Sequence, residues 1–136
     1  MIVYESDDDR LRESHTAEAL GEAWQLQLLR LPRLSSIDYI AVRKEKIVAL
    51  VELKRRNVAH DHYDTFMLSK RKVDEFIEAA NRFKLSALIA IEFTDGIYWI
   101  DGHVMSRQAV RVGGRYDRPD GIEDTYHLPR KMLRGL

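Results

Sequence analysis

The sequence predicts an α/β protein in which helices cover a sheet, and three observations support this fold class. Two stretches with helical spacing of apolar residues precede and follow a pair of strand-like runs. A continuous apolar run at residues 87–93 is typical of a buried central strand. The expected order is helix, strand, strand, helix, strand, strand, which excludes a helical bundle and a β-sandwich.

The size and composition fit one small domain. The chain has 136 residues, with 22 Lys and Arg against 22 Asp and Glu, so we expect a single domain over residues 1–136 with a less patterned tail from about residue 103. The absence of cysteine excludes disulfides, zinc fingers and thiol nucleophiles. No apolar stretch approaches the ~20 residues that span a bilayer, and the N-terminus is acidic where a signal peptide is basic. We therefore expect a cytoplasmic protein without a membrane partner.

The first helix is expected to begin at a Ser14 or Thr16 cap and to run to about Leu31, where Pro32 ends it. Its apolar stripe at helical spacing is Ala17, Leu20, Trp24, Leu28 and Leu31. Core packing explains Trp24 better than stacking on a base.

Two strands are expected next, at residues 37–42 and 47–54. The connection at residues 43–46 is too short for a crossover helix, so the strands should be antiparallel neighbours. Residues 54–87 are long enough to contain a crossover.

A second helix is expected in that connection, from Met67 or Ser69 to Phe83. Its stripe is Val73, Phe76, Ile77, Ala80 and Phe83. The strand at residues 87–93 should then form a hairpin with residues 97–100 through a turn at Asp95-Gly96. Residues 112–121, rich in Gly, Asp and Pro, indicate a surface loop.

The charges are unevenly distributed although they sum to zero. Residues 1–40 contain eight acids and four bases, whereas residues 41–72 contain nine bases and four acids. A local basic stretch is usually a solvated face, but it is also compatible with a phosphate-bearing partner.

Strand alternation identifies the candidate chemical site. Glu52 and Lys54 project from the same face of their strand. If the hairpin turn is centred on Glu45, Asp38 lies directly across from Glu52, with Cβ atoms about 4.5–5.5 Å apart. Two carboxylates this close repel each other even beside an ammonium group, and a divalent cation such as Mg²⁺ bound between them would offset that repulsion. A solvated strand end with a weak ion pair is the simpler alternative.

These residues resemble the motif of the PD-(D/E)XK nuclease superfamily. The motif reads Ile37-Asp38, thirteen intervening residues, then Glu52-Leu53-Lys54, with Ile37 where the family has proline. The resemblance also covers the helix before the motif and the crossover helix after it. It implies a restriction-endonuclease-like mixed sheet flanked by helices. It also implies an acid on the first helix, which is Glu18 or Glu22, and we favour Glu22.

The resemblance further implies a metal-dependent DNA endonuclease. Mg²⁺ or Mn²⁺ would be bound by Asp38, Glu52, Glu22 and the Leu53 carbonyl, with Lys54 stabilising charge on the phosphate. The DNA backbone would be bound by five basic residues, Arg55, Arg56, Lys70, Arg71 and Lys72.

The small size resembles that of Holliday-junction resolvases, which implies a branched DNA substrate and a homodimer. The alternatives are a non-catalytic nucleic-acid-binding protein or a phage or repair assembly protein on the same fold. His60 and His62 form an H-x-H pair, which has too few ligands for a structural metal site and indicates a polar loop. His15, His103 and His127 are expected to be structural or exposed.

Overall fold

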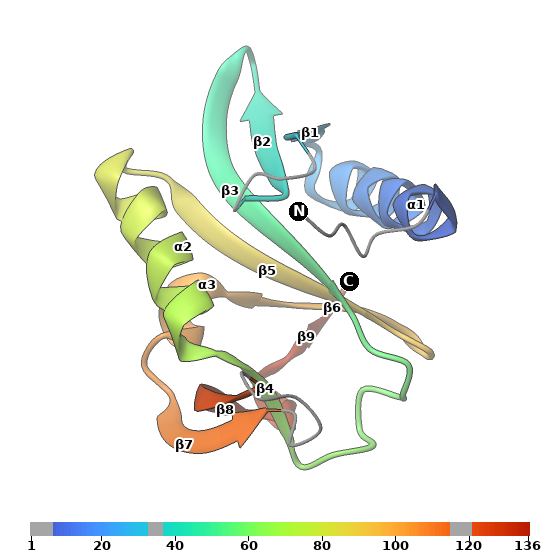
Figure 1. The fold of residues 1–136 in the computed structure, drawn as a ribbon. Coiled ribbons are helices and arrows are strands. Elements are labelled where there is room, and N and C mark those ends of the chain that lie inside the picture. Colours follow the sequence, from blue (N-terminus) through green and yellow to red (C-terminus); the bar gives the residue numbers. More distant parts are fainter. Residues whose placement is uncertain (1–6, 33–36, 115–120) are drawn as a thin grey trace.

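The computed structural model describes residues 7–32, 37–114 and 121–136 of the chain (Figure 1). The elements in chain order are α1 (Asp7–Trp24), β1 (Gln27–Arg30), β2 (Tyr39–Arg43), β3 (Lys46–Arg55), β4 (Thr65–Ser69), α2 (Lys70–Arg82), β5 (Ser86–Phe93), β6 (Gly96–Asp101), α3 (Gly102–Met105), β7 (Ala109–Gly114), β8 (Ile122–Pro129), a 3-10 turn (Arg130–Met132) and β9 (Arg134–Gly135). No helix in these described ranges is long and apolar enough to cross a membrane.

The larger sheet is mixed, as the sequence predicts. Its six strands follow the order β1-β2-β3-β5-β6-β9. β3 and β5 are parallel, and the other neighbouring strands are antiparallel. The expected crossover between β3 and β5 is confirmed, and it contains α2 together with an additional strand, β4.

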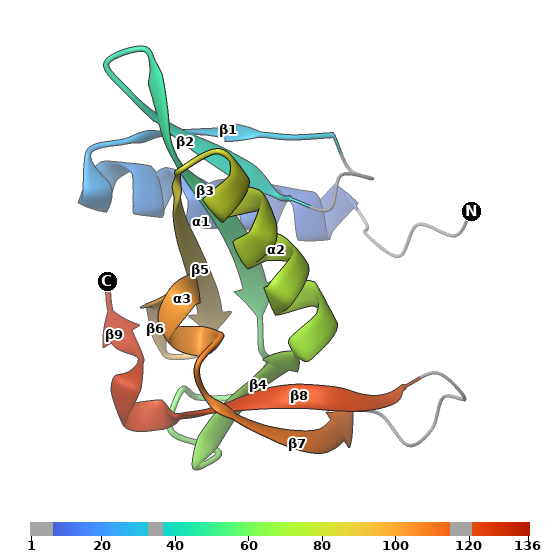
Figure 2. The same cartoon turned by 90° about the vertical axis from the view of Figure 1, so that its left-hand side faces the viewer.

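The two long helices cover opposite faces of this sheet (Figure 2). On one face, Ala17 of α1 packs on buried residues of β2 and β3 such as Tyr39 and Val51. On the other face, Val73 and Phe76 of α2 pack in a larger core with residues of β3 and β5. Alternate residues of β3 therefore face different helices.

The β2–β3 hairpin turns at Lys44 and Glu45, which both have positive φ, 51° and 65°. Two successive left-handed residues match the right-handed twist of the strands that they join. Val42 pairs with Ile47, whereas Ala41 pairs with Ala49, so one extra residue of β3 forms a bulge. Because of the bulge, Ala41 and the residues before it in β2 pair one position further along β3 than the turn alone would place them.

α2 (Lys70–Arg82) begins at the later of the two expected positions, with Ser69 as its N-cap, whereas Met67 belongs to β4. The Ser69 hydroxyl accepts a hydrogen bond from the Lys72 backbone N–H. The stripe is confirmed for Val73, Phe76 and Ala80, which are buried. It is wrong for Phe83, which is 66% exposed because the helix ends at Arg82 and Phe83 lies beyond the last turn.

The predicted extent of the first helix is wrong. α1 begins earlier, at Asp7, and ends at Trp24 rather than near Leu31. Gln25 adopts a left-handed φ of 54°, and the Leu26 N–H donates to the Gly21 carbonyl across the helix end. Only glycine fits at position 21, since a Cβ there would lie 2.8 Å from the Leu26 carbonyl oxygen. The predicted stripe positions beyond Trp24 fall in β1 and in the segment after it.

The C-terminal tail is more ordered than its pattern predicts. β7 and β8 form a second sheet with β4, in the order β4-β8-β7, and β9 pairs with the edge of the larger sheet. The expected loop at 112–121 is partly wrong, since residues 112–114 belong to β7, while residues 115–120 lie outside the described ranges. The turn after β5 is at Thr94 and Asp95, one residue before the expected position.

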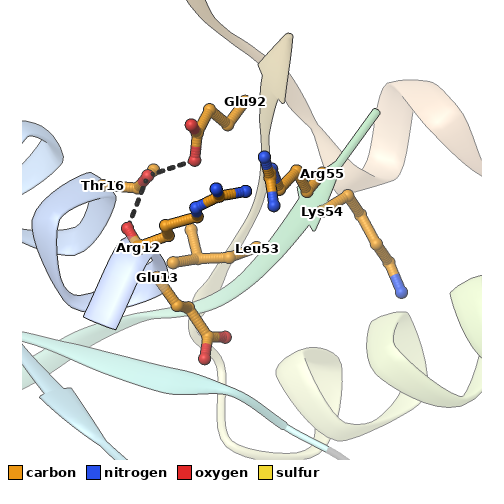
Figure 3. A pocket seen from close by; sticks show the side chains of 7 residues that line it. All are labelled: Arg12, Glu13, Thr16, Leu53, Lys54, Arg55 and Glu92. Atoms are coloured by element: carbon orange, nitrogen blue, oxygen red, sulfur yellow. Dashed lines mark hydrogen bonds between the residues drawn. The ribbon is translucent and has the colours of Figure 1, made fainter. Parts of the chain in front are cut away.

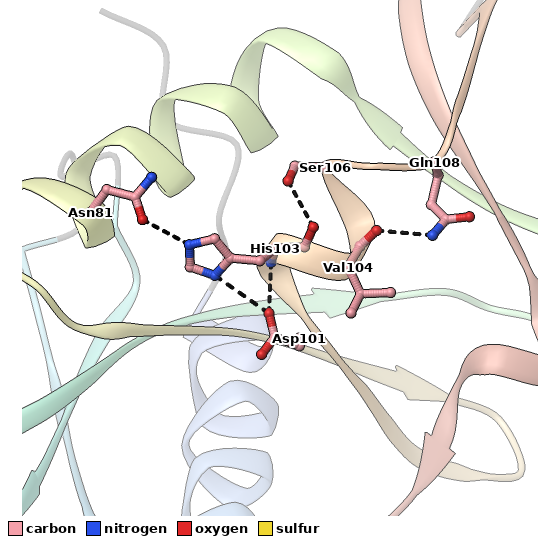
Figure 4. Close-up of polar contacts among 6 residues, drawn as sticks. All are labelled: Asn81, Asp101, His103, Val104, Ser106 and Gln108. Atoms are coloured by element: carbon pink, nitrogen blue, oxygen red, sulfur yellow. Dashed lines mark hydrogen bonds and ion pairs between the residues drawn. The ribbon is translucent and has the colours of Figure 1, made fainter.

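The short helix α3 connects the larger sheet to α2 (Figure 4). Asp101 caps it by accepting a hydrogen bond from the His103 N–H at 2.7 Å. The His103 ring then bonds the Asn81 amide oxygen of α2 through Nε2, also at 2.7 Å. His103 therefore has a structural role, as expected.

Candidate active site

Asp38, Glu52 and Lys54 line one pocket of about 270 Å³. Asp38 directly precedes β2, and the other two residues lie near the end of β3. The opposite wall comes from α2, with Arg71, Lys72, Glu75, Phe76 and Ala79. The structure thus brings the three motif residues to the α2 face of the sheet.

Asp38 is fixed against the backbone of the neighbouring strand. Tyr39 pairs with Val51, so Asp38 is at the next position, opposite Glu52. The Asp38 Oδ2 atom accepts a hydrogen bond of 2.9 Å from the Leu53 backbone N–H. This bond holds one carboxylate oxygen of Asp38 at the edge of β3, beside Glu52.

Glu52 lies in a poorly solvated position, with 15% of its side chain exposed. Burial raises the pKa of its carboxyl above the ordinary value, and the negative charge of Asp38 raises it further. Lys54 and Lys72 act in the opposite direction. The Lys54 Nζ atom lies 3.5 Å from Glu52 Oε2. The pocket therefore places two carboxylates side by side, with the ammonium groups of Lys54 and Lys72 near Glu52.

The donor set of this pocket suits a hard divalent cation. Asp38 and Glu52 offer carboxylate oxygens, the ligands that Mg²⁺ and Mn²⁺ prefer. A cation would also relieve the unfavourable ionisation of Glu52. Leu53 lies between the two motif residues of β3, and its carbonyl stays a predicted ligand.

The structure does not bring Glu22 or Glu18 into this pocket. Both are exposed on the far part of α1, beside Leu26 and Tyr39. Another acid of α1, Glu13, lines an adjacent pocket of about 350 Å³ together with Leu53 and Lys54 of β3. The sequence interpretation missed this residue because it began the helix too late.

This adjacent pocket lies on the α1 side of β3 (Figure 3). The Thr16 hydroxyl donates to Glu92 Oε2 of β5 at 2.8 Å, which links α1 to the sheet. In Figure 3 the Lys54 side chain extends away from Arg12 and Glu13. Its ammonium group therefore belongs to the pocket with Asp38 and Glu52.

The five predicted DNA-binding residues separate into different groups. Arg71 and Lys72 line the pocket with the acids. Lys70 instead pairs with Asp74 at 2.5 Å and lies over the Tyr126 ring. The remaining two, Arg55 and Arg56, line two other pockets.

Glu75 is a pocket residue that the sequence interpretation did not consider. It follows Arg71 by four positions on α2 and pairs with it at 3.3 Å. Helical spacing from the basic run could have identified it, since positions i and i+4 share a face.

The only group of three close potential metal ligands among the described residues lies elsewhere, at His60, Asp61 and Asp95. His60 bonds Asp95 through both its backbone N–H and its ring Nδ1. His62 does not belong to the group and instead contacts the Tyr63 ring edge-on. The H-x-H pair thus does not act as one pair of ligands.

Comparison with known proteins agrees with the motif. A search of curated proteins found no match. Among solved structures, Archaeoglobus fulgidus Hjc, a Holliday junction resolvase from an archaeal hyperthermophile, is similar with a TM-score of 0.56 and 14% identity. The match covers 88% of this chain and 84% of that chain, and it shows a shared fold. A family model described as "Phage putative PDDEXK endonuclease" matches residues 2–134. Since this match spans nearly the whole sequence, the chain belongs to that family of PD-(D/E)XK nucleases.

Proposed function

We propose that the chain is a divalent-metal-dependent endonuclease that hydrolyses phosphodiester bonds in DNA at Asp38, Glu52 and Lys54. The observation that supports this most is the pairing of two carboxylates across the β2–β3 hairpin, with an ammonium group 3.5 Å from one of them. A binding protein without chemistry would gain nothing from a half-buried acidic pair facing a polyanion.

Mg²⁺ or Mn²⁺ would be held by Asp38 and Glu52, with the Leu53 carbonyl as a further ligand. When bound, such a cation supplies Lewis-acid polarisation of the phosphate and a lowered pKa for a coordinated water. Glu22 is not part of the proposed set because its side chain is exposed in a different pocket.

The chain's own residues perform the remaining tasks. Lys54 neutralises part of the Glu52 charge and can donate a hydrogen bond to a phosphate oxygen as negative charge develops there. Lys72 lies close enough to lower the pKa of Glu52, so it can also meet the phosphate group at this pocket. The Leu53 N–H holds Asp38 in place throughout.

We further propose branched DNA as the preferred substrate and a homodimer as the active form. The fold shared with a Holliday junction resolvase supports this choice. A four-way junction presents two symmetric strands, and a two-fold dimer would present one pocket to each.

The test incubates the purified chain with a four-way junction, a flap, a duplex and a single strand, each with Mg²⁺ or Mn²⁺. We expect cleavage, fastest on the junction, that Asp38→Asn and Lys54→Ala abolish while DNA binding persists. Glu78→Gln is the matched control, since this exposed carboxylate of α2 pairs only with Arg82 among the described residues. Cleavage that persists in excess EDTA, or in Asp38→Asn, would refute the mechanism. Salt-sensitive binding without cleavage would indicate a binding module, and no affinity for DNA would indicate an assembly protein.

A further inference from the structure

A further pocket lies beyond the end of β3, and it is mainly apolar and aromatic. Its volume is about 360 Å³, within the range of small-ligand sites. Its walls include Arg56, Val58, His60, Tyr63, Phe66 and Phe93. We call it the aromatic pocket.

Three rings of the aromatic pocket, Phe66, Phe93 and His60, are linked by edge contacts, and Tyr98 lies behind His60. Phe93 contacts Phe66 edge-on, with ring centroids 6.1 Å apart. His60 stacks on Tyr98 at 4.2 Å with an interplanar angle of 16°. Tyr63 stands at the rim with 63% of its surface exposed. Another flat ring could therefore stack on the Tyr63 side chain without displacing core residues.

Arg56 places a positive charge in the wall of the aromatic pocket. Its guanidinium lies 5.3 Å from the Phe66 ring centroid and donates to the Arg55 carbonyl at 3.0 Å. Burial lowers its pKa, and no carboxylate in the described part of the chain forms an ion pair with it. A half-buried guanidinium with spare N–H donors is suited to the oxygen and ring-nitrogen acceptors of a ligand.

The loop that forms the pocket is braced before any ligand arrives. Asp95 accepts two hydrogen bonds from His60, and the Val58 carbonyl accepts one from the Thr94 N–H at 3.0 Å. Arg130 bonds the carbonyls of Asp61 and Asp64 from the other side. A preformed wall lowers the ordering cost of binding.

The aromatic pocket and the candidate active site are connected by a short stretch of β3 and the residue after it. Phe66 belongs to the core beneath α2, and Lys54 lines the site between β3 and α2. Arg56 follows Lys54 by two residues along an extended segment, since its N–H bonds the Glu92 carbonyl of β5. Two extended residues span about 7 Å, or two B-form rises of one DNA strand of about 3.4 Å each.

We propose that the aromatic pocket binds an unpaired nucleobase of the DNA, within about two nucleotides of the phosphate that is cut. The proposal rests on the function proposed above. Aromatic rings and an arginine plane stack any base, which favours unpaired over paired DNA. A phosphate fits the pocket poorly because its lining is mainly apolar and His60, which lines it, is already bonded to the Asp95 carboxylate.

The experiment measures DNA affinity by fluorescence anisotropy in EDTA, so that cleavage does not intervene. Three labelled duplexes are compared: one with a single unpaired adenine, one with an abasic residue at that place, and one fully paired. Tyr63→Ala removes the stacking ring and Tyr63→Phe retains it. Phe83→Ala is the matched control, because Phe83 is equally exposed, at 66%, but lies at the far end of α2.

We expect the wild type to bind the unpaired adenine more tightly than the abasic duplex. Tyr63→Ala should weaken that complex by roughly 5- to 150-fold and remove the preference, whereas Tyr63→Phe and Phe83→Ala should retain it. Equal affinity of the wild type for the adenine and abasic duplexes would overturn this inference while leaving the nuclease proposal intact. Failure to bind any of the three DNAs would also overturn this inference, and the nuclease proposal would fall with it only if the chain cleaved no DNA in Mg²⁺ or Mn²⁺.

Discussion

Replacing Glu52 by Gln should make the metal-free protein more stable. At an effective dielectric constant of 20, an ammonium 3.5 Å from the Glu52 carboxylate attracts it by about 5 kcal/mol. The pKa of Glu52 is nevertheless raised, so desolvation, together with the negative charge of Asp38, must exceed the attraction of the Lys54 and Lys72 ammonium groups. We expect Glu52→Gln to raise the free energy of unfolding by about 1 kcal/mol at pH 7, a Tm increase of about 3–5 °C.

The pH dependence has a defined sign. Because the pKa of Glu52 is raised above 4.5, the folded chain holds that proton more tightly than the unfolded chain. The resulting stabilisation is fully present below about pH 4.5 and is lost as the pH rises through the folded-state pKa. The advantage of Glu52→Gln over the wild type should therefore shrink toward pH 4.5.

A divalent cation should reverse the order of stability. Binding at a hundred times the dissociation constant stabilises the folded state by about 2.7 kcal/mol, and Glu52→Gln should lose most of this gain. The assay is urea or thermal unfolding in EDTA and then in Mn²⁺, with Glu78→Gln as the control that changes neither result. A Glu52→Gln protein less stable than the wild type in EDTA would refute the reasoning, because it would make the Lys54 ion pair the dominant interaction.

Three other substitutions test separate contacts. Gly102→Ala should cost about 1–3 kcal/mol in calorimetry, since a Cβ there would lie 3.0 Å from the Ala87 Cβ; an unchanged Tm would contradict this. Tyr126→Phe removes the hydrogen bond from the buried Tyr126 to Asp74 and should cost about 1 kcal/mol in urea unfolding; no loss would mean that this bond is not formed in solution. Lys72→Ala should reduce the slope of log affinity for DNA against log salt by about 1, and an unaltered slope would exclude Lys72 from the phosphate contacts.

The hairpin register was predictable, although one local feature that produces it was not. The prediction assumed a turn centred on Glu45, which places Asp38 opposite Glu52. The actual turn centre lies between Lys44 and Glu45, half a residue earlier, and the bulge near Val48 restores the expected pairing. Hydrophobic alternation determined the pairing at the functional end, because a one-residue slip would have turned buried residues outward.

The second sheet shows where local pattern carries too little information. β4 contains only five residues, and its partner β8 begins more than fifty residues later in the chain. Met67 could equally begin a helix when the sequence is considered alone. Long-range pairing with β8 decides in favour of a strand, and that pairing is a tertiary contact.

Glu13 of the first helix was passed over for a related reason, although its position is readable in the sequence. Glu13, Ala17, Leu20 and Trp24 follow one another at intervals of four, three and four residues, which places them on one side of α1. Extending the apolar stripe by one turn toward the N-terminus therefore reaches Glu13. In the structure Glu13 forms an ion pair with Arg30 at 2.8 Å, and only 20% of the Glu13 side chain is exposed. The flanking acid Glu22, by contrast, faces solvent. A carboxylate that interrupts an apolar stripe is costly to bury unless it has a partner, so in a helix preceding a nuclease motif it is a better candidate than an acid on the polar flank.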